Sequence, residues 1–138
     1  MTMRQVGGFN PLHCLDCNLE VDPETIGFDG QLADAIAFWD AQHGALESLE
    51  LASADYEQWA REQLLDPDRP TNREARRLAR ELSAYRRCYA WFFQPQSDED
   101  WEPPTMCPVC REALTPYSAG IFPQLLCDRD SIVIVGAG

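Results

Sequence analysis

The chain has 138 residues and a formal net charge of −12, because 23 Asp and Glu residues outweigh 11 basic residues, all of them Arg. This length and a hydrophobic fraction of 45% predict a single domain, residues 1–138, with a substantial core. The negative charge disfavours non-specific binding to phosphate backbones and favours partners with a basic surface. The absence of lysine excludes lysine-based catalysis.

The sequence contains no apolar run of the roughly eighteen residues that a membrane span requires. Its first residues also lack the apolar core of a secretion signal. We therefore expect a cytoplasmic protein. Thiols stay reduced in that compartment, so paired cysteines are expected to bind metal rather than to form disulfides.

The first segment, residues 1–28, is expected to contain loops and short strands. It includes the pair Cys14-Leu15-Asp16-Cys17, which can fold as a knuckle that presents two sulfurs to one metal ion. Asn18 follows this pair, and Asn tolerates the left-handed backbone that such a turn needs. Residues 19–21 alternate in polarity as a short strand does.

Residues 29–87 are predicted to be a helical insertion. Asp29 can cap the first helix, and Gly44 is expected to end or kink it. Residues 46–51 fit either a continued helix or a strand. The apolar face of this first helix comprises Leu32, Ile36, Trp39 and His43.

Two further helices are predicted in the insertion. Ser53 can cap the second helix, and the Pro-containing segment 66–70 interrupts the pattern. Thr71 and Glu74 then have the spacing of a capping box for the third helix. The apolar period of this helix comprises Ala75, Leu78, Ala79, Leu82, Tyr85 and Tyr89.

The remaining chain is predicted to form strands and loops. Residues 88–93 are rich in aromatic side chains and indicate a buried strand, whereas residues 94–104 form an acidic loop. Residues 121–127 and 131–135 are expected to be two more strands. The second knuckle, Cys107-Pro108-Val109-Cys110, lies between the loop and these strands.

Two Cys-x-x-Cys pairs supply the four thiolates of a closed structural zinc site. The sequence therefore predicts one Zn²⁺ ion held by Cys14, Cys17, Cys107 and Cys110. Such an ion would connect two segments that are far apart in the chain.

The segment Cys127-Asp128-Arg129-Asp130 repeats the same spacing, with Asp in the last position. A rival site could consist of Cys107, Cys110, Cys127 and Asp130, because Asp can also bind zinc. The sixth cysteine, Cys88, lies in the predicted aromatic strand and is expected to be a small core residue.

The third predicted helix is rich in arginine. One hypothesis is a stripe that binds nucleic acid, comprising Arg73, Arg76, Arg77, Arg80 and Arg87. The other is a solvated helix face in which Glu74 and Glu81 pair with Arg77 three and four residues away. The acidic charge of the whole chain favours the second interpretation.

These motifs together resemble a bacterial family of unknown function that is described as containing a zinc ribbon, with nucleic-acid binding suggested as its role. In that family the last element is another Cys-x-x-Cys pair, whereas Asp130 replaces its second cysteine here. This departure favours metal binding by the first two pairs. The segments that carry the resemblance are the two Cys-x-x-Cys pairs, Ile36 with Trp39, residues 89–92, residues 121–122 and residues 127–130.

The expected fold is α+β. It is a small antiparallel sheet of the zinc-ribbon type, with a three-helix insertion between the two Cys-x-x-Cys knuckles. The charge and size suggest a non-enzymatic protein that binds a basic protein, for example as the neutralising or immunity partner of a basic toxin. Nucleic-acid binding through the arginine-rich helix is the alternative.

Overall fold

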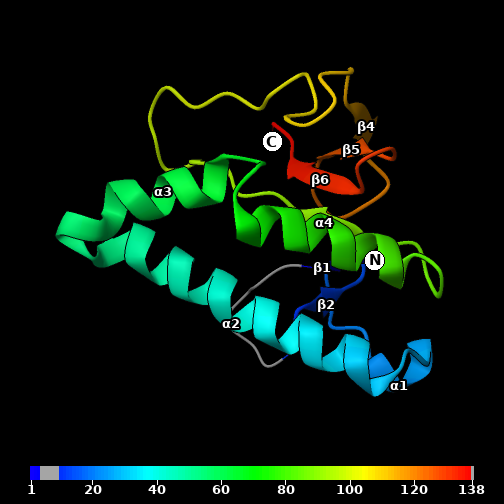
Figure 1. Cartoon of the computed structure of the whole chain (residues 1–138). Helices are drawn as coiled ribbons and strands as arrows, with labels where there is room; N and C mark the ends of the chain where they lie inside the picture. Colours follow the sequence, from blue (N-terminus) through cyan, green and yellow to red (C-terminus); the bar gives the residue numbers. More distant parts are fainter. Residues whose placement is uncertain (4–9, 138) are drawn as a thin grey trace.

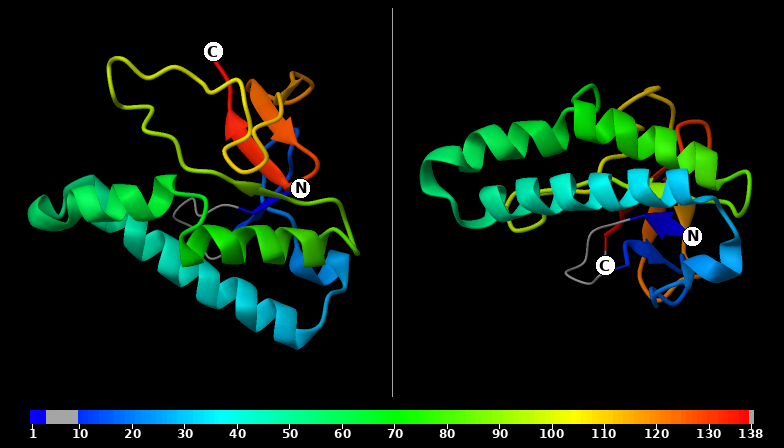
Figure 2. Two further views of the ribbon diagram at one scale, coloured as in Figure 1. Left: turned by 45° about the horizontal axis from the view of Figure 1, so that its top comes forward. Right: turned by 60° about the horizontal axis from the view of Figure 1, so that its bottom comes forward.

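The computed structural model describes residues 1–3 and 10–137 of the chain. It shows an α+β fold in which the long helices gather on one side of a six-stranded sheet (Figure 1, Figure 2). The helices are α1 (Pro23–Ile26), α2 (Gly30–Ala52), the 3₁₀ turn η1 (Ala54–Tyr56), α3 (Glu57–Leu65) and α4 (Pro70–Leu82). The strands are β1 (Thr2–Met3), β2 (Leu12–His13), β3 (Tyr89–Trp91), β4 (Thr115–Tyr117), β5 (Gln124–Cys127) and β6 (Ile132–Val135).

The sheet has the strand order β2-β1-β3-β6-β5-β4 and is mixed. Strand β3 runs parallel to both β1 and β6, whereas the other neighbouring pairs are antiparallel. The predicted all-antiparallel sheet is therefore wrong. The reason is the helical insertion, which separates β1 from β3 and gives the chain the long crossover that a parallel pair requires.

Helix α2 begins as predicted and ends later than expected. The side chain of Asp29 accepts a hydrogen bond of 2.8 Å from the backbone N–H of Leu32. The helix then continues through Gly44 to Ala52, so this glycine does not terminate it. The predicted apolar face is confirmed, since the buried residues of α2 are Leu32, Ile36, Trp39 and His43.

Helix α4 shows the predicted apolar period from Ala75 to Leu82 but has a different start, and it ends before Tyr85 and Tyr89, which the predicted period had included. Pro70 occupies its first turn and follows Arg69 in an extended conformation, so Thr71 lies inside the helix and caps nothing. Proline suits this position because its fixed φ angle matches the helix and it has no N–H to leave unpaired. The periodic residues buried on α4 are Ala75, Leu78, Ala79 and Leu82.

The later strands lie within the predicted segments. Strand β3 lies inside residues 88–93, and β5 and β6 lie inside residues 121–127 and 131–135. The short strand predicted at residues 19–21 is reduced to a single bridge between Glu20 and His13.

The two faces of the sheet carry different side chains, because successive residues of a strand point to opposite faces. On β6, Ile132 and Ile134 pack with Phe92 and Cys127 on the face that also carries Ala90. Val133 points the other way and packs with Tyr89, Leu126 and the partly buried Leu15. Since Ala90 belongs to the core beneath α2 and α4, the first of these faces is the helix-covered one.

The long loop after β3 is tied to the helices by one arginine. Arg61 of α3 donates to Glu50 of α2 at 3.0 Å and to Asp98 of the loop at 2.9 Å. None of the helices in the described residues combines the length and apolar character needed to cross a membrane.

His43 lies in the middle of α2. Its ring is almost completely buried and lies 5.0 Å from the ring of Trp39. Burial lowers the pKa of His43 to about 4, because the cationic form loses its hydration inside the core. The folded protein therefore holds His43 in its neutral form at neutral pH.

We predict that His43 makes the fold acid-sensitive. The unfolded chain takes up the proton at a pKa near 6.5, so the stabilisation is complete above that pH and is lost as the pH falls towards 4. From about pH 7.5 to about pH 5, the unfolding free energy should fall by about 2 kcal/mol more in wild type than in His43→Leu. Urea denaturation of both proteins at the two pH values measures this difference, and an identical fall in both would contradict it.

Candidate metal centre

The pair Cys107 and Cys110 lies on a tight turn before β4. The backbone N–H of Arg111 donates to the carbonyl of Cys107 at 3.0 Å, and the N–H of Cys107 donates to the backbone carbonyl of Glu112 at 2.8 Å. Arg111 has a left-handed φ of 65°. This turn is therefore a knuckle that leaves both sulfurs on one side.

A second turn of the same kind joins β5 to β6. Cys127 ends β5 and pairs with Ile132, the first residue of β6. Ser131, immediately after Asp130, has a left-handed φ of 54°, as Arg111 does after Cys110. The hairpin thus presents Cys127 and Asp130 in the same way as the Cys107–Cys110 knuckle presents its two cysteines.

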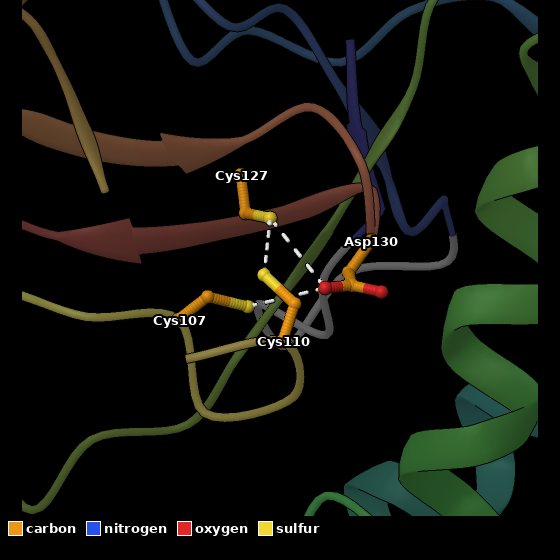
Figure 3. A group of neighbouring side chains, drawn as sticks. All are labelled: Cys107, Cys110, Cys127 and Asp130. Atoms are coloured by element: carbon orange, nitrogen blue, oxygen red, sulfur yellow. Dashed lines mark hydrogen bonds between the residues drawn. The ribbon is translucent and has the colours of Figure 1, made fainter. Parts of the chain in front are cut away.

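The two turns face each other and bring four potential ligands together (Figure 3). The ligand atoms of Cys107, Cys110, Cys127 and Asp130 all lie within 4.8 Å of one another. The Cys110 and Cys127 sulfurs are 3.7 Å apart, and Asp130 Oδ2 lies 3.4 Å from the sulfur of Cys107. A tetrahedral ion about 2.3 Å from each sulfur would separate two sulfurs by about 3.8 Å. The cluster therefore has the dimensions of a tetrahedral metal site.

The thiols of this cluster are protected from water. Cys107, Cys127 and Asp130 are buried, and Cys110 is partly buried. Burial raises the pKa of Cys107 and raises that of Cys127 to about 12. A metal ion that binds here at neutral pH must therefore displace protons from these two thiols.

Asp130 connects the cluster to helix α4. Burial acts to raise the pKa of Asp130, but hydrogen bonds from the three thiols and the charge of Arg80 outweigh burial and lower it. Oxygen Oδ2 faces the cysteines, while Oδ1 lies 3.9 Å from Arg80. This arrangement is typical of a metal ligand whose orientation is set by an outer partner.

The structure does not bring Cys14 and Cys17 to this cluster. They form a separate knuckle, and Leu15 between them packs on the sheet face opposite to Cys127. The fold instead brings together the ligands of the rival site, which the repeated x-x spacing at Cys127 and Asp130 had indicated. Cys88 is buried in the main core, as predicted.

Several side chains of the arginine stripe already have acidic or backbone partners. Arg77 pairs with Glu74 and Glu81, as its helical spacing predicted. Arg76 is 9% exposed and donates to the carbonyl of Pro67 at 2.7 Å. Arg87 donates to the carbonyl of Asp128 at 2.7 Å and lies over the ring of Tyr89, whereas Arg73 is exposed.

Comparison of the chain with protein-family models, with curated proteins and with solved structures gives no match in any of the three. The family resemblance drawn from the motifs therefore stays a prediction. What can be said of the site rests on its own geometry.

We predict that Cys127→Ser abolishes tight metal binding at this cluster and that Cys88→Ala does not. Changes to outer partners alone cost about 10–100-fold in affinity, so loss of a ligand should cost more than about 100-fold. Titration with Co²⁺ measures this through the sulfur-to-metal charge-transfer band. Equal affinity in Cys127→Ser and Cys88→Ala would contradict this assignment of ligands.

Proposed function

We propose that the ion is zinc and that its role is structural. The proposal rests on a donor set of three sulfurs and one carboxylate, a combination suited to a tetrahedral zinc ion. All four positions are filled by the protein, whereas a catalytic zinc keeps one position open for water or substrate. A reducing compartment such as the cytoplasm would keep these thiols available.

We further propose that the chain is a non-enzymatic protein that binds a basic protein partner. Helix α2 supports this proposal because it has no arginine or lysine along its 23 residues. Its outward side also exposes Phe38 and Leu51, which are 69% and 79% accessible. The charged residues of α2 are Asp34, Asp40, Glu47 and Glu50.

A groove on α2 combines these acidic and apolar features. It has a volume of about 610 Å³ and is lined by Asp40, Ala41, Gly44, Ala45, Glu47, Ser48 and Leu51. Oxygen Oδ1 of Asp40 is buried without a hydrogen-bond partner in the described part of the chain, and burial raises the pKa of this carboxyl group. Small residues beside two acidic side chains on this surface of α2 fit a partner helix that carries arginine or lysine among apolar residues.

We predict that the immobilised protein captures a basic protein from its own cells and that Asp40→Arg with Glu47→Arg abolishes the capture. The reversed charges would repel a basic surface, whereas the control Glu99→Arg changes the net charge only at a loop outside the groove. Capture by wild type and control should weaken as salt rises. Equal capture by the groove variant, or no basic protein bound to wild type at low salt, would refute the proposed partner.

Nucleic-acid binding is a second candidate, supported by a hollow of about 500 Å³ beside the second knuckle. Four arginines line this hollow, and the partly buried Val109 of the knuckle lines it as well. The residues that line it are Pro70, Arg73, Glu74, Arg76, Arg77, Arg80 and Val109.

This second candidate predicts measurable affinity for single-stranded RNA or duplex DNA that falls steeply with salt. Arg73→Glu should weaken that affinity and reduce the salt dependence, because Arg73 is exposed at the hollow. Arg86→Glu is the matched control, since Arg86 is also exposed but does not line the hollow. An electrophoretic mobility shift assay at low salt measures this affinity. The absence of a shift with both nucleic acids would exclude this function.

A further inference from the structure

Cys14 and Cys17 have the same backbone geometry as the knuckle in the metal centre. The N–H of Asn18 donates to the carbonyl of Cys14 at 3.0 Å, and the N–H of Cys14 donates to the carbonyl of Leu19 at 2.8 Å. The corresponding bonds of Cys107 have the same two lengths. Asn18 has a left-handed φ of 58°, close to the 65° of Arg111. The sequence thus builds a third turn of the same kind as the two that form the candidate metal centre.

Tertiary contacts hold this knuckle in place. The N–H of Ile121 bonds to the carbonyl of Asp16 at 2.8 Å, and the hydroxyl of Tyr117 donates to the Asp16 carboxylate. Gly120 lies so close that a Cβ atom there would be 3.1 Å from the carbonyl oxygen of Leu15. The turn is therefore braced from β4 and the following loop, independently of any ion bound to it.

Within the described part of the chain, no further ligand group completes a site at this knuckle. Among the described residues, the only cluster of three or more potential ligands is the one around Cys107. The segments outside the description, residues 4–9 and 138, contain no Cys, His, Asp or Glu in their sequence. Two thiolates are thus half of the tetrahedral donor set that a structural zinc site requires.

The half-site faces solvent. Cys17 is exposed and Cys14 is partly exposed, unlike the buried sulfurs of Cys107 and Cys127. Leu19 and Ile121, whose backbones bond to knuckle residues, are each 69% exposed. Two open thiols with apolar side chains beside them form a surface suited to another protein rather than to water.

We propose that Cys14 and Cys17 form a second metal site, which takes zinc or another soft divalent ion and is completed by the same two cysteines of a second copy of this chain. A two-fold axis through the ion gives four equivalent thiolates in a tetrahedral arrangement and a self-complementary interface. Leu19 and Ile121 would pack around that axis. The ion would be separate from one bound in the buried cluster, because Cys14 packs against a different group of core residues from Cys107, Cys110 and Cys127.

Native mass spectrometry of the zinc-loaded, fully reduced protein tests this proposal. We expect a dimer with three zinc ions, one in each buried cluster and one shared. Cys14→Ser with Cys17→Ser should give a monomer with one ion, whereas Cys88→Ala should leave the dimer unchanged. A wild-type monomer, with either one or two zinc ions, would overturn the proposal.

Two further measurements separate this ion from a purely structural effect. Leu19→Glu with Ile121→Glu keeps all six thiols, and we expect it to weaken the dimer by at least about tenfold while each copy retains its buried ion. Each copy has a charge of −12, so raising the salt concentration should strengthen the dimer by screening repulsion. A dimer that forms equally well in this variant, or in protein stripped of its exposed ion by a chelator, would refute the shared site.

Discussion

Two turns in the final third of the chain face each other. This contact is the constraint on which the rest of the structure depends. Cys107 and Cys110 come from a loop that precedes β4, and Cys127 and Asp130 come from the β5–β6 hairpin. Thiols and a carboxylate are costly to bury side by side unless a cation or hydrogen bonds compensate them. A bound divalent ion would supply that compensation and would fix the two turns relative to each other.

The helices are coupled to this cluster through charge as well as through packing. Arg80 projects from α4 towards Asp130, and Arg76 is buried nearby with its pKa lowered chiefly by that burial. Three thiolates and one carboxylate around a divalent ion leave about two negative charges, so cationic neighbours on α4 reduce the electrostatic cost of the site. A metal ion bound in this cluster would therefore account for part of the arginine-rich face of α4.

The proposed roles belong to different parts of the molecule. The buried cluster lies on the helix-covered face of the sheet, and the groove with Asp40 and Glu47 lies along α2. The exposed knuckle at Cys14 is braced by Tyr117 and the loop that contains Gly120. Metal binding in the buried cluster would therefore support the scaffold, while α2 and the exposed knuckle remain accessible to other molecules.

The sequence by itself determined the features that depend on local spacing. The buried faces of α2 and α4, the cap at Asp29, the strand at β3 and the knuckle turns all follow from periods of two to four residues. Only the tertiary structure decided which cysteine pairs meet, because three turns of equal spacing compete and the fold brings the ligands of two of them together. It also decided the parallel pairing of β3 and the passage of α2 through Gly44. These outcomes depend on which face of a sheet a side chain occupies and on contacts between distant segments, and local spacing contains neither.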